Sequence, residues 1–350
     1  MKQEGIKMDN LRVLNLDDNK WDEIVKSFKD YDVYYLSGYL KSLKINGDGE
    51  PLLFFYEDDN CRGINVVLKR DISLDSRFSD LEKNKYFDFT TPYGYSGWIV
   101  EGNEYNNLFL EYEKWCKDNN IICEFVRFHP LINNQIYSEN NYNVIPLGQL
   151  ISIDCSNEET MWMNMSSRNR NKIKKAIKTG VVVDSGDIDK LDTFISIYEE
   201  TMTRDNALDY YFFNREYYDC LFKELKGNCK IFSASLDGKV LSSCIIFMVN
   251  NRLSYHLAGS TRVSGNIYET NLLIYEVAKW GCQNGYKSFL LGGGVGSGED
   301  YLYQFKRGFD DKHSYQFYIG KKIYKQDLYD ELVNRRNDIS NHNFFPEYRG

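Results

Sequence analysis

The stretch LLIYEVAKWGCQNGYKSFLLGGG (residues 272–294) decides the fold class of this chain, because it contains a helix, a strand and a tight turn in succession. Its apolar side chains recur at the spacing of one helix face, at Leu273, Val277 and Trp280. We expect Thr270 or Asn271 to cap that helix. A strand follows and runs into three consecutive glycines, so the sequence predicts a sheet strand that ends in a sharp turn.

The residues before this stretch predict an antiparallel meander, since three β-rich runs are separated by the turn pairs Asp237-Gly238 and Asn250-Asn251. The first half of the chain repeats this pattern, with strands followed by a helix over 105–119 and another strand. The sequence therefore predicts two similar mixed α+β units, each a mostly antiparallel sheet flanked by helices. The runs of the meander are Cys229–Leu236, Val240–Val249 and Leu253–Ala258.

The length of 350 residues also favours two domains, because one domain usually holds roughly 100 to 200 residues. We place the first at residues 1–148 and the second at 149–320. A last helix is predicted over 321–340, where Leu328 and Leu332 share one face.

The composition excludes several classes of function. Lys and Arg number 43 against 51 Asp and Glu, and the net charge of −8 disfavours a generic nucleic-acid coat, so DNA is not an expected partner. The eight cysteines form no C-x-x-C pair, which is typical of reduced thiols. The four histidines are far apart, so no metal site and no covalently bound cofactor is expected.

The chain lacks the apolar segments that targeting and membrane insertion require. Its first ten residues, MKQEGIKMDN, contain no apolar core of the signal-peptide kind. Its longest apolar run, Val240–Val249, is interrupted by Ser242 and Ser243. We therefore expect a cytoplasmic protein with no membrane span.

A basic helix is predicted by SSRNRNKIKKAIKTG (residues 166–180), which stands out in a chain that is acidic overall. Arg168 and Arg170 open the run, and four lysines follow within eight residues. A solvated helix face is the structural alternative. The functional interpretation is a local attractor for the phosphates of a ligand.

The glycines Gly292, Gly293 and Gly294 resemble a phosphate loop only superficially, because no Gly-Lys-Ser/Thr follows them. A sharp turn after a strand is the structural interpretation. The alternative is a set of bare backbone amides that face a reacting carbonyl. Asp300 and Lys306 lie just downstream, in DYLYQFKRGF on a predicted short helix, where Lys306 is either a solvated lysine or a functional cation.

Two aromatic segments of the first half, TTPYGYSG (90–97) and EFVRFHPL (124–131), are predicted to be loops or strand ends. Tyr93 and Tyr95 could line an acceptor groove or pack in the core. No Ser-His-Asp or Cys-His arrangement can be assembled. Direct acyl transfer to an amine needs none, because it requires positioning, a free amine and oxyanion donors. Asp300, Glu269 and His256 are unranked candidates for the base.

These segments, in this order, resemble the FemABX or methicillin-resistance-like acyltransferases, which are tandem GNAT proteins with a BioF2-like acetyltransferase domain. The resemblance also rests on YEETMTRDNALDYYFF (198–213) and YHLAGS (255–260), and it runs along most of the chain. It implies two GNAT-like domains, with the C-terminal helix 321–340 returning to the first. The long helical-hairpin arm of some members is absent.

The resemblance also implies roles for individual residues. Lys306 matches a catalytic lysine, and Arg204 matches an arginine that contacts the phosphates of a nucleotide-linked precursor. The donor is expected beside the helix after YHLAGS. We accordingly assign Lys306 and Asp300 to catalysis, Arg204, Tyr93, Tyr95, Tyr211, Arg168 and Arg170 to substrate binding, and Gly292, Gly293, Gly294, Thr270 and Asn271 to donor binding.

The function implied is transfer of an acyl or aminoacyl group to a primary amine of a cell-envelope precursor, such as a peptidoglycan stem peptide. The co-substrate is either an aminoacyl-tRNA, which makes tRNA a candidate partner, or an acyl-CoA. Two alternatives stay open: an acyl-CoA-dependent N-acetyl- or acyltransferase acting on an amino sugar or other small amine, and a non-catalytic binding module with the same fold.

Overall fold

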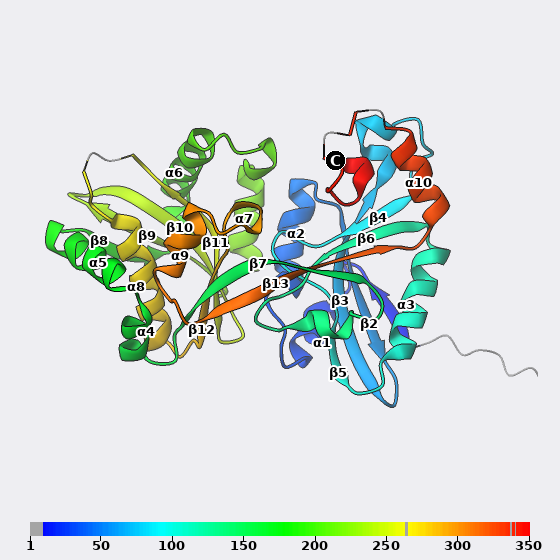
Figure 1. Ribbon diagram of the computed structural model, residues 1–350, viewed down its shortest axis with the longest axis horizontal. Coiled ribbons are helices and arrows are strands. Elements are labelled where there is room, and N and C mark those ends of the chain that lie inside the picture. The colour runs from blue at the N-terminus through cyan, green and yellow to red at the C-terminus, as the bar shows by residue number, and fades with distance from the viewer. Residues whose placement is uncertain (1–9, 263–264, 337, 340) are drawn as a thin grey trace, which may run out of the picture. The chain divides into compact units, whose positions relative to one another are not determined.

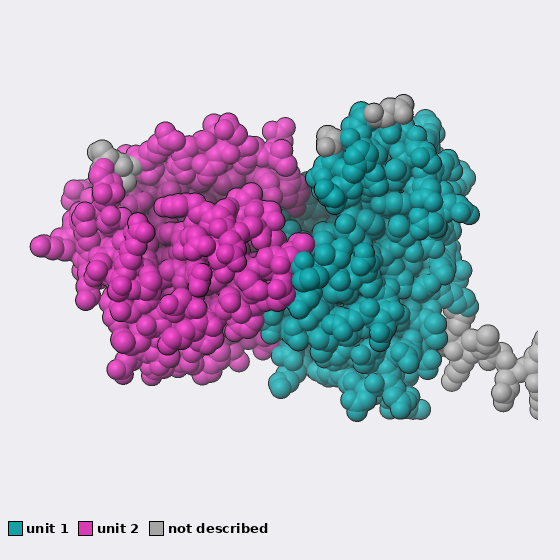
Figure 2. Space-filling view, viewed as in Figure 1, with its two compact units in different colours: residues 1–146, 318–350 teal, residues 147–317 magenta. Residues whose placement is uncertain are grey.

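The computed structural model describes residues 10–262, 265–336, 338–339 and 341–350 (Figure 1). Residues 1–9 of the decapeptide MKQEGIKMDN, in which no signal peptide is expected, lie outside this part. The chain divides into two compact units: unit 1, Met1–Pro146 with Tyr318–Gly350, and unit 2, Leu147–Phe317 (Figure 2). Both are mixed α+β, which confirms the predicted fold class.

The sheet of unit 1 is mostly antiparallel, and β4 and β6 form its one parallel pair of strands among the described residues. Its strands follow the order β1-β2-β3-β4-β6-β13, and β5 pairs with β3. The strand bounds are β1 Leu11–Leu14, β2 Glu50–Glu57, β3 Cys61–Asp71, β4 Phe87–Thr90, β5 Ile99–Gly102, β6 Ile121–Arg127 and β13 Ser314–Ile323.

Helices of unit 1 pack on this sheet through periodic apolar residues. In α3, Leu108, Tyr112 and Cys116 are fully buried against β-strand side chains that include Phe54 and Val126. The helices are α1 Trp21–Ser27, α2 Ser37–Asn46, α3 Asn106–Asp118 and α10 Gln326–Asn334, with short 3-10 turns η1 Val33–Tyr35 and η4 Asn134–Tyr137.

Unit 2 contains the predicted meander, which is confirmed as β9, β10 and β11. Its strands follow the order β7-β12-β11-β10-β9-β8, and β11 with β12 is parallel. The bounds are β7 Asn143–Asp154, β8 Val182–Gly186, β9 Cys229–Leu236, β10 Lys239–Val249, β11 Arg252–Ser260 and β12 Ser288–Gly292.

The parallel strands β11 and β12 are paired only at their beginnings. Their register ends at Ser254 opposite Leu290, whereas β11 continues to Ser260. A bulge in β11 adds to this divergence, because Ile245 faces Leu257 while the next residue of β10 faces Tyr255, and His256 is the extra residue. The two strands therefore separate toward their carboxyl ends.

Helices cover both faces of the unit 2 sheet (Figure 1). Side chains of α4, α5, α8 and α9, among them Met161, Ile173, Leu273 and Tyr303, share one buried cluster with the sheet. On the opposite face α6 approaches so closely that a Cβ on Gly259 would lie 2.7 Å from the Ile197 carbonyl oxygen. The bounds are α4 Glu158–Asn164, α5 Ser167–Thr179, α6 Leu191–Arg204, α7 Arg215–Glu224, α8 Glu269–Gln283 and α9 Tyr301–Arg307.

Two predicted boundaries are wrong. Thr270 and Asn271 do not cap α8, because the helix begins at Glu269 and its N-cap is Tyr268 in the left-handed region. The predicted C-terminal helix over 321–340 is too long. Ile323 ends β13, whose pairing with β6 runs to Cys123, and only Gln326–Asn334 is helical. Residues 337 and 340 lie outside the described residues.

No helix in the part of the chain that the structure describes combines the length and the apolar character needed to cross a bilayer.

Candidate active site

Lys306 lies on α9 and reaches back to the glycine-rich turn that follows β12. Its Nζ donates a hydrogen bond to the carbonyl oxygen of Gly293 at 2.7 Å. Burial lowers the pKa of the Lys306 ammonium to about 8, and nearby Asp300 opposes this shift. The structure thus places the Lys306 cation in a poorly hydrated position next to the backbone of the glycine turn.

The turn needs glycine at Gly292 because of its positive φ, and at Gly293 and Gly294 because neighbouring atoms leave no room for a Cβ. Gly292 has a φ of +80°, and a Cβ there would lie 3.5 Å from the Lys306 Nζ. A Cβ on Gly293 would lie 2.8 Å from Leu150 Cδ2, and one on Gly294 would lie 2.2 Å from Asp300 Oδ1. The backbone of the turn is therefore held tightly between β7 and the start of α9.

Asp300 joins this turn to the helix that carries Lys306. One carboxylate oxygen accepts from the backbone N–H of Tyr303, and the other accepts from that of Val295, each at 2.9 Å. These two bonds lower the pKa of Asp300, with the Tyr303 bond contributing most. Asp300 is thus the N-cap of α9, and its bond with Val295 also fixes the turn before that helix.

Three helix ends meet beside this turn. The backbone N–H and the hydroxyl of Ser166, the N-cap of α5, donate to the carbonyl oxygen of Gly308 at the end of α9. Asn271 in the first turn of α8 donates through Nδ2 to Oδ1 of Asn169 in the first turn of α5, at 2.7 Å. The structure therefore brings Lys306, the basic helix and the predicted donor residues into one region of unit 2.

This region contains a buried polar atom without a partner. Asn169 is 4% exposed, and its Nδ2 has no hydrogen-bond partner among the described residues. An unsatisfied buried amide is costly. It lies in the first turn of α5, where the N–H groups of the helix also favour negative charge.

The basic side chains of α5 differ in what they contact. Arg170 Nη1 donates to the carbonyl oxygens of Trp162, Met163 and Met165, so this side chain caps the end of α4. Arg168 is exposed at the helix start. The remaining lysines of the predicted run lie along the helix, where Lys172 and Lys175 approach the ring of Tyr268 at 5.5 and 5.4 Å, and Lys174 and Lys178 are exposed.

Arg204 ends α6 and binds the end of β11. Its Nη1 donates to the carbonyl oxygen of Ser260 at 2.6 Å, and its side chain is 20% exposed. Ser260 faces Ser242 across the sheet, and the Thr270 hydroxyl donates to the Ser242 hydroxyl at 3.1 Å. Arg204 and the start of α8 are thus linked through two strand ends.

His256 occupies the bulge of β11, a setting that its sequence neighbours do not indicate. Its Nε2 lies 2.8 Å from the hydroxyl of Tyr217 on α7, and its ring stacks on Phe247 at 4.1 Å. Burial lowers the pKa of His256 to about 3, so the imidazole is neutral at physiological pH. Such a group is a poor base.

The remaining predicted substrate residues have different settings. Tyr95 is 8% exposed, and its ring packs against Tyr34 and His129, each at 5.3 Å between ring centroids. Tyr93 is half-buried in the same loop of unit 1. Tyr211, in unit 2, lies on a short 3-10 turn and contacts the ring of Tyr210 at 5.4 Å.

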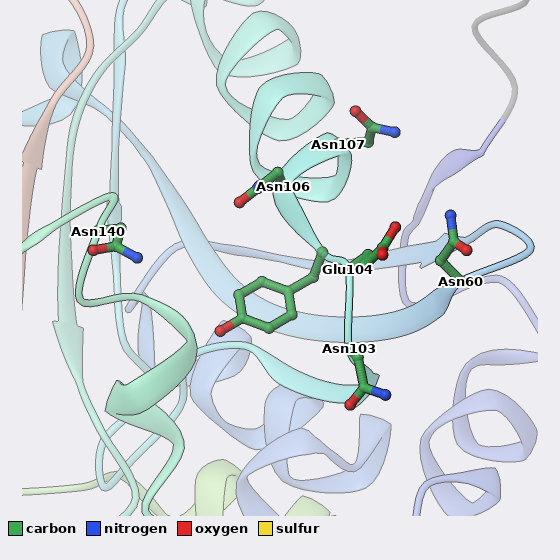
Figure 3. A pocket seen from close by; sticks show the side chains of 7 residues that line it. Asn60, Asn103, Glu104, Asn106, Asn107 and Asn140 are labelled. Atoms are coloured by element: carbon green, nitrogen blue, oxygen red, sulfur yellow. The ribbon is translucent and has the colours of Figure 1, made fainter.

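A hollow of about 480 Å³ lies elsewhere in unit 1, at the start of α3 (Figure 3). It holds none of the predicted site residues, and its lining offers no lysine, arginine, histidine or thiol for acyl transfer. The lining residues are Asn60, Asn103, Glu104, Tyr105, Asn106, Asn107 and Asn140.

Comparisons with known proteins show which families and folds this chain resembles. Residues 143–242 match the model of the FemAB family. Over 348 residues the chain is 25% identical to the UDP-N-acetylmuramoylpentapeptide-lysine N(6)-alanyltransferase of Weissella viridescens, a match covering 92% of this chain and 99% of that protein. The crystal structure of FemX matches with a TM-score of 0.67 and 16% identity, covering 92% of this chain and 99% of that one. The structure of L-PGS from Bacillus licheniformis matches with a TM-score of 0.53 and 14% identity, covering 87% and 92%. The resemblance to FemABX-type proteins is thereby confirmed.

Proposed function

We propose that this protein is an aminoacyltransferase that acylates the lysine side-chain amine of a nucleotide-linked peptidoglycan precursor. The observation that carries the proposal is the Lys306 ammonium, poorly hydrated and bonded to the carbonyl of Gly293. The alanyltransferase of Weissella viridescens, similar over most of both chains, supports the choice of acceptor. We infer that the reaction takes place in the cytoplasm.

The chemistry is the attack of an amine on an activated carbonyl. The acceptor nitrogen forms a bond to the carbonyl carbon, an oxyanion develops, and the bond from carbon to the leaving oxygen or sulfur breaks. The amine loses one proton and the leaving group gains one. We assign the ammonium of Lys306 to the developing oxyanion, because a desolvated cation stabilises such charge more strongly than a hydrated one.

Two of the three candidates for the base are disfavoured by their pKa values. Asp300 has a lowered pKa and accepts two backbone N–H groups, and His256 has a pKa of about 3, so neither is matched to proton transfer near neutral pH. We therefore assign Asp300 to holding α9 and its lysine in position. Glu269, at the start of α8, is the remaining candidate.

Donor binding is assigned to the meeting point of α5, α8 and α9. Gly292, Gly293 and Gly294 would expose backbone to the reacting carbonyl. Thr270 and Asn271 lie in the first turn of α8, and the Nδ2 of Asn169, which has no partner among the described residues, supports a polar ligand there. Arg168 and the exposed lysines of α5 would attract phosphates of the acceptor or the donor, while Arg170 holds the end of α4.

Acceptor binding is assigned to Arg204, Tyr211, Tyr93 and Tyr95. Arg204 is anchored by Ser260 and Asp205, and its side chain is 20% exposed, which leaves it able to contact a phosphate. Tyr93 and Tyr211 would offer amphipathic rings to the sugar and peptide of the precursor, and Tyr95, whose own ring is buried, would hold the loop that carries Tyr93.

The donor is tested by a radiolabelled transfer assay with two donors, alanyl-tRNA and acetyl-CoA, and two acceptors, the UDP-linked lysine pentapeptide and glucosamine. We expect label on the lysine pentapeptide with alanyl-tRNA. Label on glucosamine from acetyl-CoA would favour the small-amine acyltransferase instead. No transfer from either donor, with both ligands bound, would indicate a non-catalytic binding module.

A further inference from the structure

The loop Thr90–Gly97 of unit 1, which carries Tyr93 and Tyr95, is held by side chains along nearly its whole length. After Thr90, which ends β4, it contains no helix or strand, yet rings fill the space beside its glycines. Gly94, with a φ of +123°, lies so close to Tyr34 that a Cβ would be 2.1 Å from the ring, and one on Gly97 would be 2.7 Å from Phe128. The loop therefore has little freedom to change its path.

Four carbonyl oxygens of this loop accept hydrogen bonds from side chains. The Tyr39 hydroxyl donates to that of Tyr93. The other three bonds are Arg127 Nε to Gly94 at 3.1 Å, Asn134 Nδ2 to Ser96 at 2.9 Å, and the Tyr35 hydroxyl to Gly97 at 2.7 Å. Because these donors come from η1, α2, β6 and η4, four separate elements fix one short loop.

Two of the four donors, Tyr35 and Asn134, are held in position by a pair of buried residues. These are Asp32 and His129, which are 1% and 0% exposed. Asp32 Oδ1 accepts from the backbone N–H of Val33 and so caps η1, which carries Tyr35. The backbone N–H of His129 donates to Asn134 Oδ1 at 2.8 Å, which directs the Nδ2 of that residue to the loop.

The proton of the His129 ring is fixed by its neighbours. Its Nδ1 accepts from the backbone N–H groups of Leu131 and Ile132, at 3.2 and 3.3 Å. The proton therefore lies on Nε2 and is donated to Asp32 Oδ2 at 3.1 Å. A proton on Nδ1 would face the N–H groups of Leu131 and Ile132, which are donors too. The pair therefore has one stable arrangement of its hydrogen bonds.

We propose that Asp32 and His129 are positioning residues, which hold the loop Thr90–Gly97 in the conformation that binds the amine acceptor. This inference rests on the proposed function for the roles of Tyr93 and Tyr95. A preorganised loop lowers the entropy lost when a ligand binds, so loosening it weakens acceptor binding and leaves the chemical step unchanged.

The test is the isosteric variant Asp32→Asn. The amide of the variant cannot accept from both Val33 and His129, so one of these N–H groups must face the new NH₂ group and the pair comes apart. We expect the KM of the UDP-linked lysine pentapeptide to rise about tenfold, since one buried donor loses its partner. We expect kcat to change by less than about twofold and the donor KM to stay constant.

The matched control is Asp88→Asn. Asp88 is also a fully buried carboxylate of unit 1, and it accepts from Arg70, Arg349 and Tyr348, none of which is among the four side chains that donate to the loop. This variant should lose stability and keep the acceptor KM of the wild type. An equal rise of KM in both variants, or no rise in Asp32→Asn, overturns the positioning role.

Amide hydrogen exchange separates this inference from the proposed function. Asp32→Asn should accelerate exchange over Tyr93–Gly97, and Asp88→Asn should not. If the wild type fails to acylate the lysine pentapeptide, the proposed function is wrong. The rate of hydrogen exchange then still shows whether Asp32 and His129 hold the loop. Unchanged exchange in Asp32→Asn contradicts the inference in either case.

Discussion

The Lys306 ammonium donates to the carbonyl oxygen of Gly293, which lies thirteen residues earlier in the chain, within the glycine-rich turn. The bond holds the cation in place before any substrate binds. A preorganised cation needs little reorganisation when negative charge develops, which is the condition under which electrostatic stabilisation is most effective. Lys306 and Gly293 thus form the centre of the candidate active site.

The lowered pKa of Lys306 predicts a pH dependence. The ammonium is present below a pH of about 8 and is lost above it. From pH 8 to 10, deprotonation of the acceptor amine raises the single-turnover rate and loss of the Lys306 charge lowers it, each by up to about tenfold per unit, so the rate should level off above pH 8 if the charged form stabilises the oxyanion. A rate that keeps rising over this range, as expected for simple deprotonation of the acceptor amine, would argue against the assignment.

The sharp turn at Gly292 predicts that adding one methyl group there lowers turnover. Gly292→Ala strains a left-handed residue and places a Cβ 3.5 Å from the Lys306 Nζ. Gly285→Ala is the matched control, because its φ of +81° is almost the same and its Cβ would meet nothing within 4 Å. Both should lose about 1 to 2 kcal/mol of stability in urea unfolding. Only Gly292→Ala should also lose turnover, and equal turnover would remove the turn from the site.

Asp300 can be tested by separating its charge from its capping role. Asparagine caps helices about as well as aspartate and can keep the bond from Tyr303, but its NH₂ group cannot accept from Val295, so Asp300→Asn should keep only part of the activity. Asp300→Ala loses both bonds and should unfold at a lower temperature and turn over more slowly still. The measurement is the rate constant of transfer together with the thermal midpoint. If Asp300→Asn is inactive but as stable as the wild type, the carboxylate is a base and our assignment to positioning is wrong.

The basic face of α5 predicts a salt dependence if the donor is a tRNA. The double variant Lys174→Gln/Lys178→Gln should reduce the slope of the logarithm of donor affinity against the logarithm of salt concentration, by about 0.7 to 0.9 for each lost phosphate contact. Lys223→Gln/Lys226→Gln, which removes two exposed lysines elsewhere in unit 2, is the control. A flat salt response in the wild type, with saturable binding of CoA, would identify the thioester as the donor.

Much of the fold could be predicted because the local patterns are strong. The meander β9 to β11 matches its predicted runs closely, since two-residue turns with Asp-Gly and Asn-Asn separate clear apolar strands. The C-terminal boundary could not be predicted as well. Leu328 and Leu332 suggest a helix, but Ser314–Ile323 is a strand whose pairing with β6 is a long-range contact that no local period encodes.

The site could be predicted only in part. Lys306 follows the glycine-rich turn closely in sequence, so its approach to Gly293 could be anticipated. The link between Asn169 and Asn271 joins residues 102 positions apart, and the Asp32–His129 pair joins residues 97 apart. The basic run predicts that Arg170 binds phosphate, yet its side chain caps α4. A cation also interacts favourably with the carbonyl groups at the C-terminal end of a helix, and the sequence does not distinguish the two roles.

The measurement that tests the central claim most directly is the single-turnover rate of aminoacyl transfer to the UDP-linked lysine pentapeptide by Lys306→Met. The variant keeps the length and apolar reach of the side chain and removes its charge. Arg307→Met, which removes an exposed cation from the next position of α9, is the control. We predict that Lys306→Met is folded, binds the acceptor like the wild type, and transfers roughly 10² to 10³ times more slowly, while Arg307→Met is close to the wild type. A folded Lys306→Met that transfers at the wild-type rate would contradict the account.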